Sequence, residues 1–282
     1  MKISKGYIVS GTLLGLALSL VVFVMGYSLV ILNNVQYKNP GVTIPIETNL
    51  QTVEAPDNMK EGMEVPVFDE EKIWNVLLIG SDARPGDPGY GRSDAMILMT
   101  VNEKTGKIHL TSLMRAIYVS IPNEPDPRYI NNYSPNYMLN AAHTWGGPEL
   151  LLKTVQRNFR VDVPHYIEVD FEGFTEVIDA VGGVTINLTE AEAYHLGLAP
   201  GPQWMNGATA LDYSRIRKID SDFNRMGRQR TVIAALINQM RDVDVVTLAK
   251  TAEAITPSLT TNYSKSELLS IISKAPTYQK YD

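Results

Sequence analysis

The feature that most constrains this chain is a long uncharged stretch near its N-terminus. Lys2 and Lys5 precede an uncharged segment, residues 6–32, and the next charged residue is Lys38. About 20 apolar residues span the hydrocarbon core of a bilayer, so this segment can cross a membrane with some tilt. A cleaved signal peptide would have a shorter apolar region that ends in a small-residue cleavage site. We therefore expect an uncleaved transmembrane helix over residues 6–32.

The flanking charges predict how the chain is oriented. Lys2 and Lys5 place residues 1–5 in the cytoplasm, because positive charges favour the cytoplasmic side. The rest of the chain is then expected outside the cell membrane, in a Gram-positive-type envelope. Residues 33–72 contain several prolines, acids and threonines, which is typical of a linker. Residues 73–282 then form one globular domain.

Composition excludes several classes of site. The chain has no cysteine, so disulfides, cysteine-ligated zinc and thiol catalysis are absent. Its net charge is −6, whereas a nucleic-acid-binding domain normally has a basic surface. We therefore expect no nucleic-acid partner. The four histidines are scattered without the spacing of a zinc site.

Strand and helix patterns alternate along the domain, which favours an α/β or α+β fold. The expected strands are 74–79, 95–101, 107–113, 117–121, 166–169 and 184–188. The expected helices are 147–158, 171–181, 208–213 and 223–240. We expect a mixed central sheet flanked by helices.

Arginines gather around the start of the helix expected over 223–240. The basic residues of this cluster are Arg215, Arg217, Lys218, Arg225, Arg228 and Arg230. Arg225 and Arg228 fall in the first turns, where the partial positive charge of the helix disfavours cations. A bound phosphate would offset this unfavourable charge, since the N–H groups of helix N-termini and of arginines are good hydrogen-bond donors to phosphate oxygens. The alternative is a solvated helix face with local ion pairs. The residues alone leave both interpretations open.

Two aspartates flank the loop between the first two expected strands of the domain. Asp82 and Arg84 follow the first strand, and Arg92 and Asp94 precede the second. If the strands are neighbours, both carboxylates lie at one sheet edge, where they could hold Mg²⁺ together with substrate phosphates. Alternatively, aspartate–arginine ion pairs brace the loop.

A series of short motifs runs through the domain: 75–84 (NVLLIGSDAR), 91–94 (GRSD), 113–115 (LMR), 118–119 (YV), 121–122 (IP), 139–142 (LNAA), 146–150 (GGPEL), 170–174 (DFEGF), 181–184 (VGGV), 213–217 (YSRIR), 220–223 (DSDF) and 228–230 (RQR). In this order they resemble the motifs of the LytR-CpsA-Psr family over about residues 75–240. The single N-terminal anchor expected above also fits this family.

The resemblance implies an activity and its partners. Members transfer a cell-wall glycopolymer, such as teichoic acid or capsule, from undecaprenyl pyrophosphate to the muramic acid C6 hydroxyl of peptidoglycan. An apolar pocket holds the polyprenyl tail, Asp82 and Asp94 match the Mg²⁺ ligands, and the catalytic residues are expected to be Arg115, Asp222 and Arg225. The side chains expected around the pyrophosphate are Arg84, Arg92, Arg115, Arg215, Arg217, Arg225, Arg228 and Gln229.

Two positions depart from the family pattern. The residue after Arg115 is usually Asp and is Ala116 here, and a basic residue is replaced by Met138. Asp222 or Asp220 could supply a general base instead. Two alternatives to a transferase stay open: a polyprenyl-pyrophosphate or wall-polymer binding protein without catalysis, and a lipid-pyrophosphate hydrolase with water as acceptor.

Overall fold

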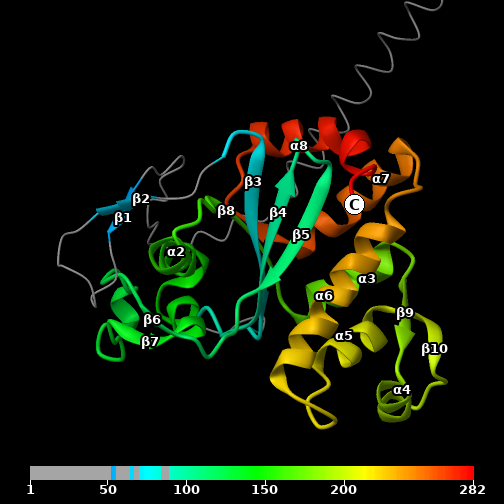
Figure 1. Cartoon of the computed structure of the whole chain (residues 1–282), viewed down its shortest axis with the longest axis horizontal. Coiled ribbons are helices and arrows are strands. Elements are labelled where there is room, and N and C mark those ends of the chain that lie inside the picture. Colours follow the sequence, from blue (N-terminus) through cyan, green and yellow to red (C-terminus); the bar gives the residue numbers. More distant parts are fainter. Residues whose placement is uncertain (1–51, 55–63, 67–69, 84–88) are drawn as a thin grey trace, which may run out of the picture.

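A five-stranded mixed sheet forms the centre of the protein (Figure 1). The computed structural model describes residues 52–54, 64–66, 70–83 and 89–282. The strand order is β11-β8-β3-β4-β5. The bounds are β3 Ile73–Ser81, β4 Ser93–Asn102, β5 Lys107–Ser112, β8 His165–Val169 and β11 Thr260–Thr261. Strands β3 and β8 are parallel, and the other neighbours are antiparallel. The expected mixed sheet is therefore confirmed.

Both faces of the central strands carry apolar side chains. On β3, Leu77 and Ile79 are buried on one face, while Leu78 and Gly80 point to the other, because side chains alternate along a strand. This explains why β3 reads as an almost continuous apolar run, as expected of a strand covered on both faces.

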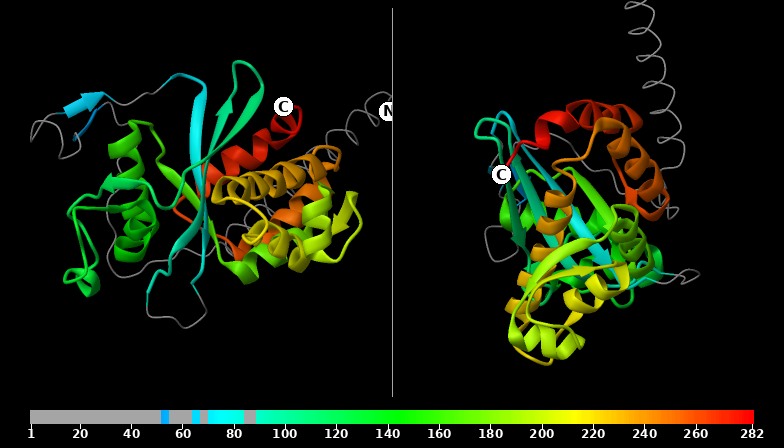
Figure 2. Two further views of the ribbon diagram at one scale, coloured as in Figure 1. Left: turned by 60° about the horizontal axis from the view of Figure 1, so that its bottom comes forward. Right: turned by 90° about the vertical axis from the view of Figure 1, so that its right-hand side faces the viewer.

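Helix α2 (Leu139–Phe159) covers the first face of the sheet and completes the main hydrophobic core (Figure 2). Leu150, Leu151 and Val155 of α2 are fully buried against Leu77 and Tyr166 of the sheet. This face is closely packed.

Helices α3 (Phe171–Ala180), α5 (Gly207–Arg215) and α6 (Asp222–Gln239) lie on the opposite face (Figures 1 and 2). Ser221 caps α6 by accepting a hydrogen bond from the backbone N–H of Asn224. A second core cluster joins these helices to β9, β10 and α4.

The smaller elements surround these two layers. Their bounds are β1 Thr52–Glu54, β2 Glu64–Pro66, β6 Tyr118–Ser120, β7 Asn136–Met138, β9 Val184–Leu188, β10 Gly201–Met205, α4 Glu190–Leu196, α7 Val245–Ile255 and α8 Lys265–Tyr278, with 3-10 helices at Pro127–Tyr129 and Thr256–Ser258. Three two-stranded sheets form from β1–β2, β6–β7 and β9–β10.

Two expected elements differ from the structure. The strand expected over 117–121 is shorter and pairs with β7 outside the central sheet. The helix expected over 147–158 is the second part of α2, which begins at Leu139. Gly146 and Gly147 have non-helical backbone angles, so α2 contains a break that Pro148 follows.

The transmembrane helix expected over residues 6–32 lies outside the described residues. Among the helices that the structure does describe, none has the length and apolar character needed to span a bilayer.

Candidate functional site: an apolar pocket with a cationic mouth

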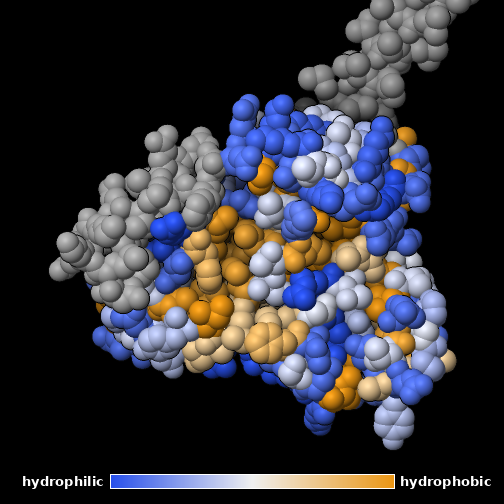
Figure 3. Space-filling view, in the orientation of Figure 1, coloured by the Kyte–Doolittle hydropathy of each residue, from blue (hydrophilic) through white to orange (hydrophobic). Residues whose placement is uncertain are grey.

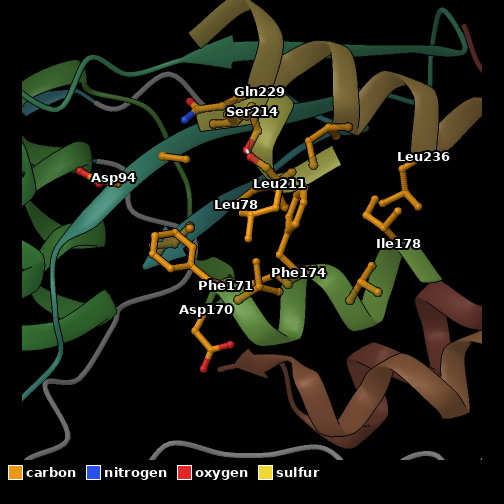
Figure 4. A pocket seen from close by; sticks show the side chains of 18 of the residues that line it. Leu78, Asp94, Asp170, Phe171, Phe174, Ile178, Leu211, Ser214, Gln229 and Leu236 are labelled. Carbon is orange, nitrogen blue, oxygen red and sulfur yellow. Dashed lines mark hydrogen bonds between the residues drawn. The ribbon is translucent and has the colours of Figure 1, made fainter. Parts of the chain in front are cut away.

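The second face of the sheet encloses a pocket with a volume of about 300 Å³. Side chains from β3, β4, β8, α3, α5 and α6 form its walls (Figure 4). The apolar wall residues include Leu78, Ile97, Ile167, Phe171, Phe174, Ile178, Leu211, Ile233, Leu236 and Ile237. Such a lining suits an apolar chain, since polar groups placed here would lack hydrogen-bond partners.

Charged and polar side chains gather at one end of this pocket. Five of them are Asp94, Arg215, Arg217, Arg225 and Gln229, and Asp170 and Ser214 also line the pocket. Figure 4 places Asp94 at the end opposite Ile178 and Leu236, so the pocket has a polar mouth and an apolar far end. An amphipathic ligand with an anionic head would match both ends.

Asp94, in β4, joins two arginines that are far apart in the sequence. Its Oδ1 accepts a hydrogen bond from Nη1 of Arg115 at 2.7 Å, and its Oδ2 lies 3.3 Å from Nη2 of Arg217. Arg115 is partly buried and Arg217 is exposed, so solvent weakens both pairs. One carboxylate thus holds two cations at the mouth.

Arg225, in the second turn of α6, is the most unusual of these cations. It is 2% exposed, and Nη2 lies 2.9 Å from Oδ1 of Asp222. Within the described part of the chain, its Nε and Nη1 have no hydrogen-bond partner. Burial, together with the nearby Arg217 charge, lowers the pKa of Arg225 below its ordinary value. A buried guanidinium that lacks acceptors is costly, and an anion at the mouth would remove that cost.

Arg228 also lies on α6, but acceptors within the protein balance its charge. Its Nη1 and Nη2 donate to Asp220 at 2.7 and 2.8 Å, and Nη2 also donates to the carbonyl of Ile216 at 2.8 Å. Nη1 lies 3.4 Å from Glu192. Arg228 does not line the pocket. The structure therefore places it beneath the loop that carries Arg217, apart from the expected phosphate contacts.

Arg215 and Gln229 complete the mouth. The Arg215 guanidinium carbon lies 4.4 Å from the centre of the Phe171 ring, a cation–π contact that joins α5 to α3. Arg215 is in the last turn of α5, where the helix dipole favours a cation. Gln229 lines the pocket one turn after Arg225.

Asp82 and Arg92 face each other across the β3–β4 loop. Oδ1 of Asp82 accepts a hydrogen bond from the backbone N–H of Arg92 at 2.5 Å, and their backbones pair at 3.0 Å. Gly91 has φ +70°, and a side chain there would lie 2.6 Å from the backbone nitrogen of Ala83. Arg84, the remaining expected phosphate contact, lies outside the described residues.

Two aspartates at this edge provide the oxygen atoms that a hard divalent cation prefers. Ser81 of β3 pairs with Ser93 of β4 after a register shift, so Asp82 lies just beyond the end of β3 and Asp94 is the second residue of β4 at the same edge of the sheet. Where the structure describes the chain, no group of three or more His, Asp or Glu side chains could hold a metal. A Mg²⁺ ion held by this pair would need water and substrate oxygens as its other ligands, and both oxygens of Asp94 are paired with arginines in the structure.

Glu192 is a residue at the base of the site that the sequence analysis did not single out. It occupies the third position of α4, where it forms a capping box with Thr189 and also reaches Arg228. The Thr-x-x-Glu pattern at 189–192 would have predicted the start of α4, but not the contact with an arginine 36 residues later.

Comparison with known proteins assigns the chain to a family. A sequence model of the LytR_cpsA_psr family matches residues 42–281. The chain belongs to the LytR_cpsA_psr family. This match includes the sheet, the pocket and the arginine cluster described above.

Two relatives in this family carry the same name. The polyisoprenyl-teichoic acid–peptidoglycan teichoic acid transferase TagU of Oceanobacillus iheyensis is 35% identical over 240 residues, which cover 83% of this chain and 71% of the relative. The protein of the same name from Bacillus subtilis is 33% identical over 69% of this chain. The chain spans 61% of the length of that second relative.

Solved structures of related proteins have the same fold. Bacillus subtilis TagV matches with a TM-score of 0.62 and 27% identity, over 76% of this chain and 84% of TagV. A structure described as TagT bound to LI-WTA matches with a TM-score of 0.61 and 26% identity, over 82% of each chain.

Proposed function

We propose that this member of the LytR_cpsA_psr family transfers a cell-wall glycopolymer from a polyprenyl-pyrophosphate carrier to the C6 hydroxyl of muramic acid in peptidoglycan. The names of the TagU relatives support a transfer of this class. The observation that carries the proposal is the pocket itself. Its apolar walls suit a polyprenyl tail, and its mouth holds Arg225, whose buried Nε and Nη1 have no acceptor among the residues that the structure describes.

In the proposed reaction, the carrier pyrophosphate lies among Arg115, Arg217 and Arg225. The acceptor hydroxyl oxygen forms a bond to the phosphorus that carries the glycopolymer. The bond from that phosphorus to the bridging oxygen breaks, and polyprenyl phosphate leaves with the bonding electron pair. Fixed guanidinium groups lower the barrier because negative charge develops on the phosphoryl oxygens.

Asp222 is the proposed general base for the acceptor proton. It is the first residue of α6, its side chain is 36% exposed, and it lies 2.9 Å from Arg225. Solvent can reach this carboxylate, and its partner Arg225 lines the pocket. Ala116, which follows Arg115 directly, supplies no carboxylate of its own.

Asp82 and Asp94 are the proposed residues that hold Mg²⁺. A bound Mg²⁺ would supply additional positive charge next to the transferring phosphoryl group. Because Asp94 holds Arg115 and Arg217 in the structure, this residue would position the arginines and also contribute an oxygen to the metal.

A transfer assay tests the proposal. The full chain in detergent is given a synthetic polyprenyl-pyrophosphate glycan, peptidoglycan oligomers and Mg²⁺, with or without EDTA. We expect a phosphodiester-linked product that EDTA suppresses. Arg115→Ala and Asp94→Ala should lower transfer on the order of 100-fold or more. Lys104→Ala, which removes a surface cation paired with Glu70, is the control. Normal transfer by both variants would refute the proposal.

A binding protein without catalysis is the second candidate, and Ala116 is the observation that favours it. This candidate requires tight carrier binding without product, and a gain of transfer in Ala116→Asp. Transfer by the unaltered chain excludes it. Release of polymer without peptidoglycan would instead indicate a lipid-pyrophosphate hydrolase.

The proposed location is the outer side of the cell membrane, with residues 6–32 as the anchor and 33–72 as the linker. Because the chain has no cysteine, a single substitution, Ser266→Cys on α8, gives a specific label site. We expect a membrane-impermeant maleimide to label this variant in intact cells. Labelling only after lysis would contradict the orientation.

A further inference from the structure

Exposed aromatic rings lie on the paired strands β6 and β7, close to Arg115. Tyr118 is 70% exposed and Tyr137 is 41% exposed, and their ring centres are 6.5 Å apart. Tyr137 lies 5.4 Å from Trp145, which in turn lies 5.6 Å from Tyr133. These four rings are called the aromatic ribbon below. A cluster of exposed aromatic side chains often marks a binding site, whereas single exposed apolar residues are common on any surface.

The aromatic ribbon is joined directly to the mouth of the pocket. Tyr118 follows Arg115 by three residues, which span at most roughly 11 Å when extended. The backbone N–H of Asn140 donates to the carbonyl of Arg115 at 3.2 Å, and that of Leu139 donates to Ile117 at 2.8 Å. These bonds fix the start of α2 beside Arg115. Figure 3 shows apolar surface on this face between β6 and α6.

The two chain segments that carry the four rings contain one ionisable side chain apart from the tyrosines, that of His143. No Lys, Arg, Asp or Glu occurs in residues 116–123 or 129–148. The second segment contains four asparagines: Asn131, Asn132, Asn136 and Asn140. Asparagine both donates and accepts hydrogen bonds, and tyrosine combines an apolar ring with a hydroxyl. This chemistry suits a neutral ligand that has apolar faces, hydroxyls and amides.

A neutral glycan strand has those properties, because its sugar rings present C–H faces that stack on aromatic rings, and its N-acetyl groups are amides. An anionic phosphate-containing polymer would instead call for lysine or arginine along the ribbon. The exposed side chain opposite Tyr118 is Met138, which is apolar. The ribbon is therefore better matched to the acceptor than to the donor polymer.

We infer that the aromatic ribbon binds the N-acetylated glycan strand of the acceptor and directs its hydroxyl toward the phosphate near Arg115. This inference rests on the proposed function, since it names the acceptor surface of the same site. Tyr118 and Tyr137 supply the stacking faces, with Trp145 as the buried support beneath Tyr137. Both tyrosines act through binding and take no part in the bond changes.

The test measures glycan binding and donor binding separately on the full chain in detergent. The probe is a peptide-free oligomer of alternating N-acetylglucosamine and N-acetylmuramic acid whose lactyl carboxyl groups are converted to amides, so that the strand is neutral. We expect Tyr118→Ala and Tyr137→Ala each to weaken its binding roughly five- to tenfold, as for loss of one stacking contact. Tyr118→Phe should bind nearly as well as the parent, because the ring remains. Polyprenyl-pyrophosphate binding should be unchanged in all three variants.

Tyr194→Ala is the matched control, since Tyr194 is 90% exposed on α4, away from the ribbon. Because Tyr137 packs on Trp145, the melting temperature of each variant is measured as well. If Tyr137→Ala is unstable, Tyr118→Ala still tests the inference, because Tyr118 is largely exposed. Parent-like glycan binding by Tyr118→Ala would overturn the inference. So would a selective loss of binding to a soluble teichoic acid fragment.

The outcomes separate the inference from the proposed function. Ring-dependent glycan binding by a chain that shows no transfer would support the inference and count against the transferase. Transfer by the parent, together with an unchanged acceptor KM in Tyr118→Ala, would support the transferase and count against the inference. Arg115→Ala should lose transfer and keep glycan binding.

Discussion

Two buried arginines one turn apart on α6 show how the same residue type can serve binding or stability. Arg225 and Arg228 are 2% and 3% exposed. Arg228 donates to Asp220 and the carbonyl of Ile216, and it lies close to Glu192. Arg225 pairs with one carboxylate among the described residues, that of Asp222. The difference lies in the acceptors that the surrounding chain supplies, because both cations are equally removed from water.

We predict that only one of the two truncations lowers stability. Arg228→Ala leaves two carboxylates without their cation and should lower the free energy of unfolding by about 3–5 kcal/mol. Arg225→Ala removes a poorly compensated buried charge, so the chain should be about as stable as the parent but lose pyrophosphate binding. Thermal unfolding and a pyrophosphate titration measure both. A stable Arg228→Ala variant with weak pyrophosphate binding would return Arg228 to the phosphate site.

Asp126 should make the protein sensitive to acid. Its carboxylate accepts hydrogen bonds from Nε and Nη2 of Arg128 at 2.9 and 2.7 Å, and these bonds lower the pKa of Asp126 to about 2. A carboxyl pKa that is lower in the folded state stabilises the fold above its unfolded value and loses that effect as pH falls toward 2. Solvent reaches Arg128, so the contribution is on the order of 1–2 kcal/mol.

The matching experiment is urea unfolding of Asp126→Asn at pH 7, 4 and 3. The variant should be less stable than the parent at pH 7, and the gap should shrink as the pH falls. Asp242→Asn, at an exposed loop position, is the control. A gap that stays constant down to pH 3 would show that the charge of Asp126 is unimportant.

At the scale of elements, the break in α2 at Gly146 and Gly147 allows this helix to contact the β3–β4 loop. Gly147 has φ +70° and ψ −165°, a combination that is accessible essentially only to glycine. A side chain there would lie 2.7–3.1 Å from the ring of Tyr90. Tyr90 lies next to Gly91 in the β3–β4 loop, and His143 and Thr144 of α2 contact the Gly91 carbonyl at 3.3 and 3.0 Å. The break therefore lets α2 approach the loop that carries Arg92.

Gly147→Ala should destabilise the protein by about 1–3 kcal/mol, because it adds backbone strain and displaces Tyr90. Gly227→Ala is a matched control in the interior of α6, where the new methyl group would have no neighbour nearer than 4.0 Å. That control should gain roughly 0.5–1 kcal/mol from helix propensity. Chemical unfolding of both variants checks the pair, and a loss in Gly227→Ala larger than that in Gly147→Ala would contradict it.

Elements with one dominant local pattern could be predicted from the sequence. The apolar run at 74–79, the periodic segments 171–181 and 223–240, and the Gly182-Gly183 stop all have close counterparts in β3, α3, α6 and the turn before β9. Strand β10 was not expected, because Pro202 and Gly201 disfavour strands; its pairing with β9 overrides that preference. The first part of α2 was not expected because the Gly146-Gly147 break separates it from the periodic part.

The site could be predicted only as a set of residues. Arginines near a helix N-terminus and aspartates at a strand edge are local patterns, so they were found in the sequence. The partners of Asp94 are 21 and 123 residues away, and only tertiary packing decides that both reach it. Arg225 pairs with Asp222 three residues away, whereas Arg228 also reaches the carbonyl of Ile216 and Glu192, 12 and 36 residues earlier, and only tertiary packing decides those contacts.

At the scale of the whole molecule, the two faces of the sheet have different roles. Helix α2 fills one face, and the other encloses the pocket. Helix α6 runs along that pocket, with Arg225 near its start and Leu236 near its end. Eleven residues of helix rise by roughly 16 Å, so one rigid element relates the polar mouth to the apolar far end.

This arrangement predicts a limit on tail length. Leu236→Trp should fill the far end of the pocket, so that a long polyprenyl pyrophosphate binds more weakly while a short-chain analogue binds as before. Val246→Trp, at an exposed position of α7 outside the pocket, is the control. Titrating both ligands into each variant measures the effect. Equal weakening of the two would indicate general damage to the fold.

The two ion pairs of Asp94 have a consequence for selectivity among anions. Without ligand, Asp94 serves Arg115 and Arg217 as an internal counter-ion. An incoming anion must therefore outcompete a carboxylate that is tethered in place and pays no entropy of association. A singly charged or monodentate anion gives little advantage over such a competitor. A group with several negative oxygens, such as the proposed pyrophosphate, can engage Arg225 as well, so we expect Asp94 to bias the site against simple anions.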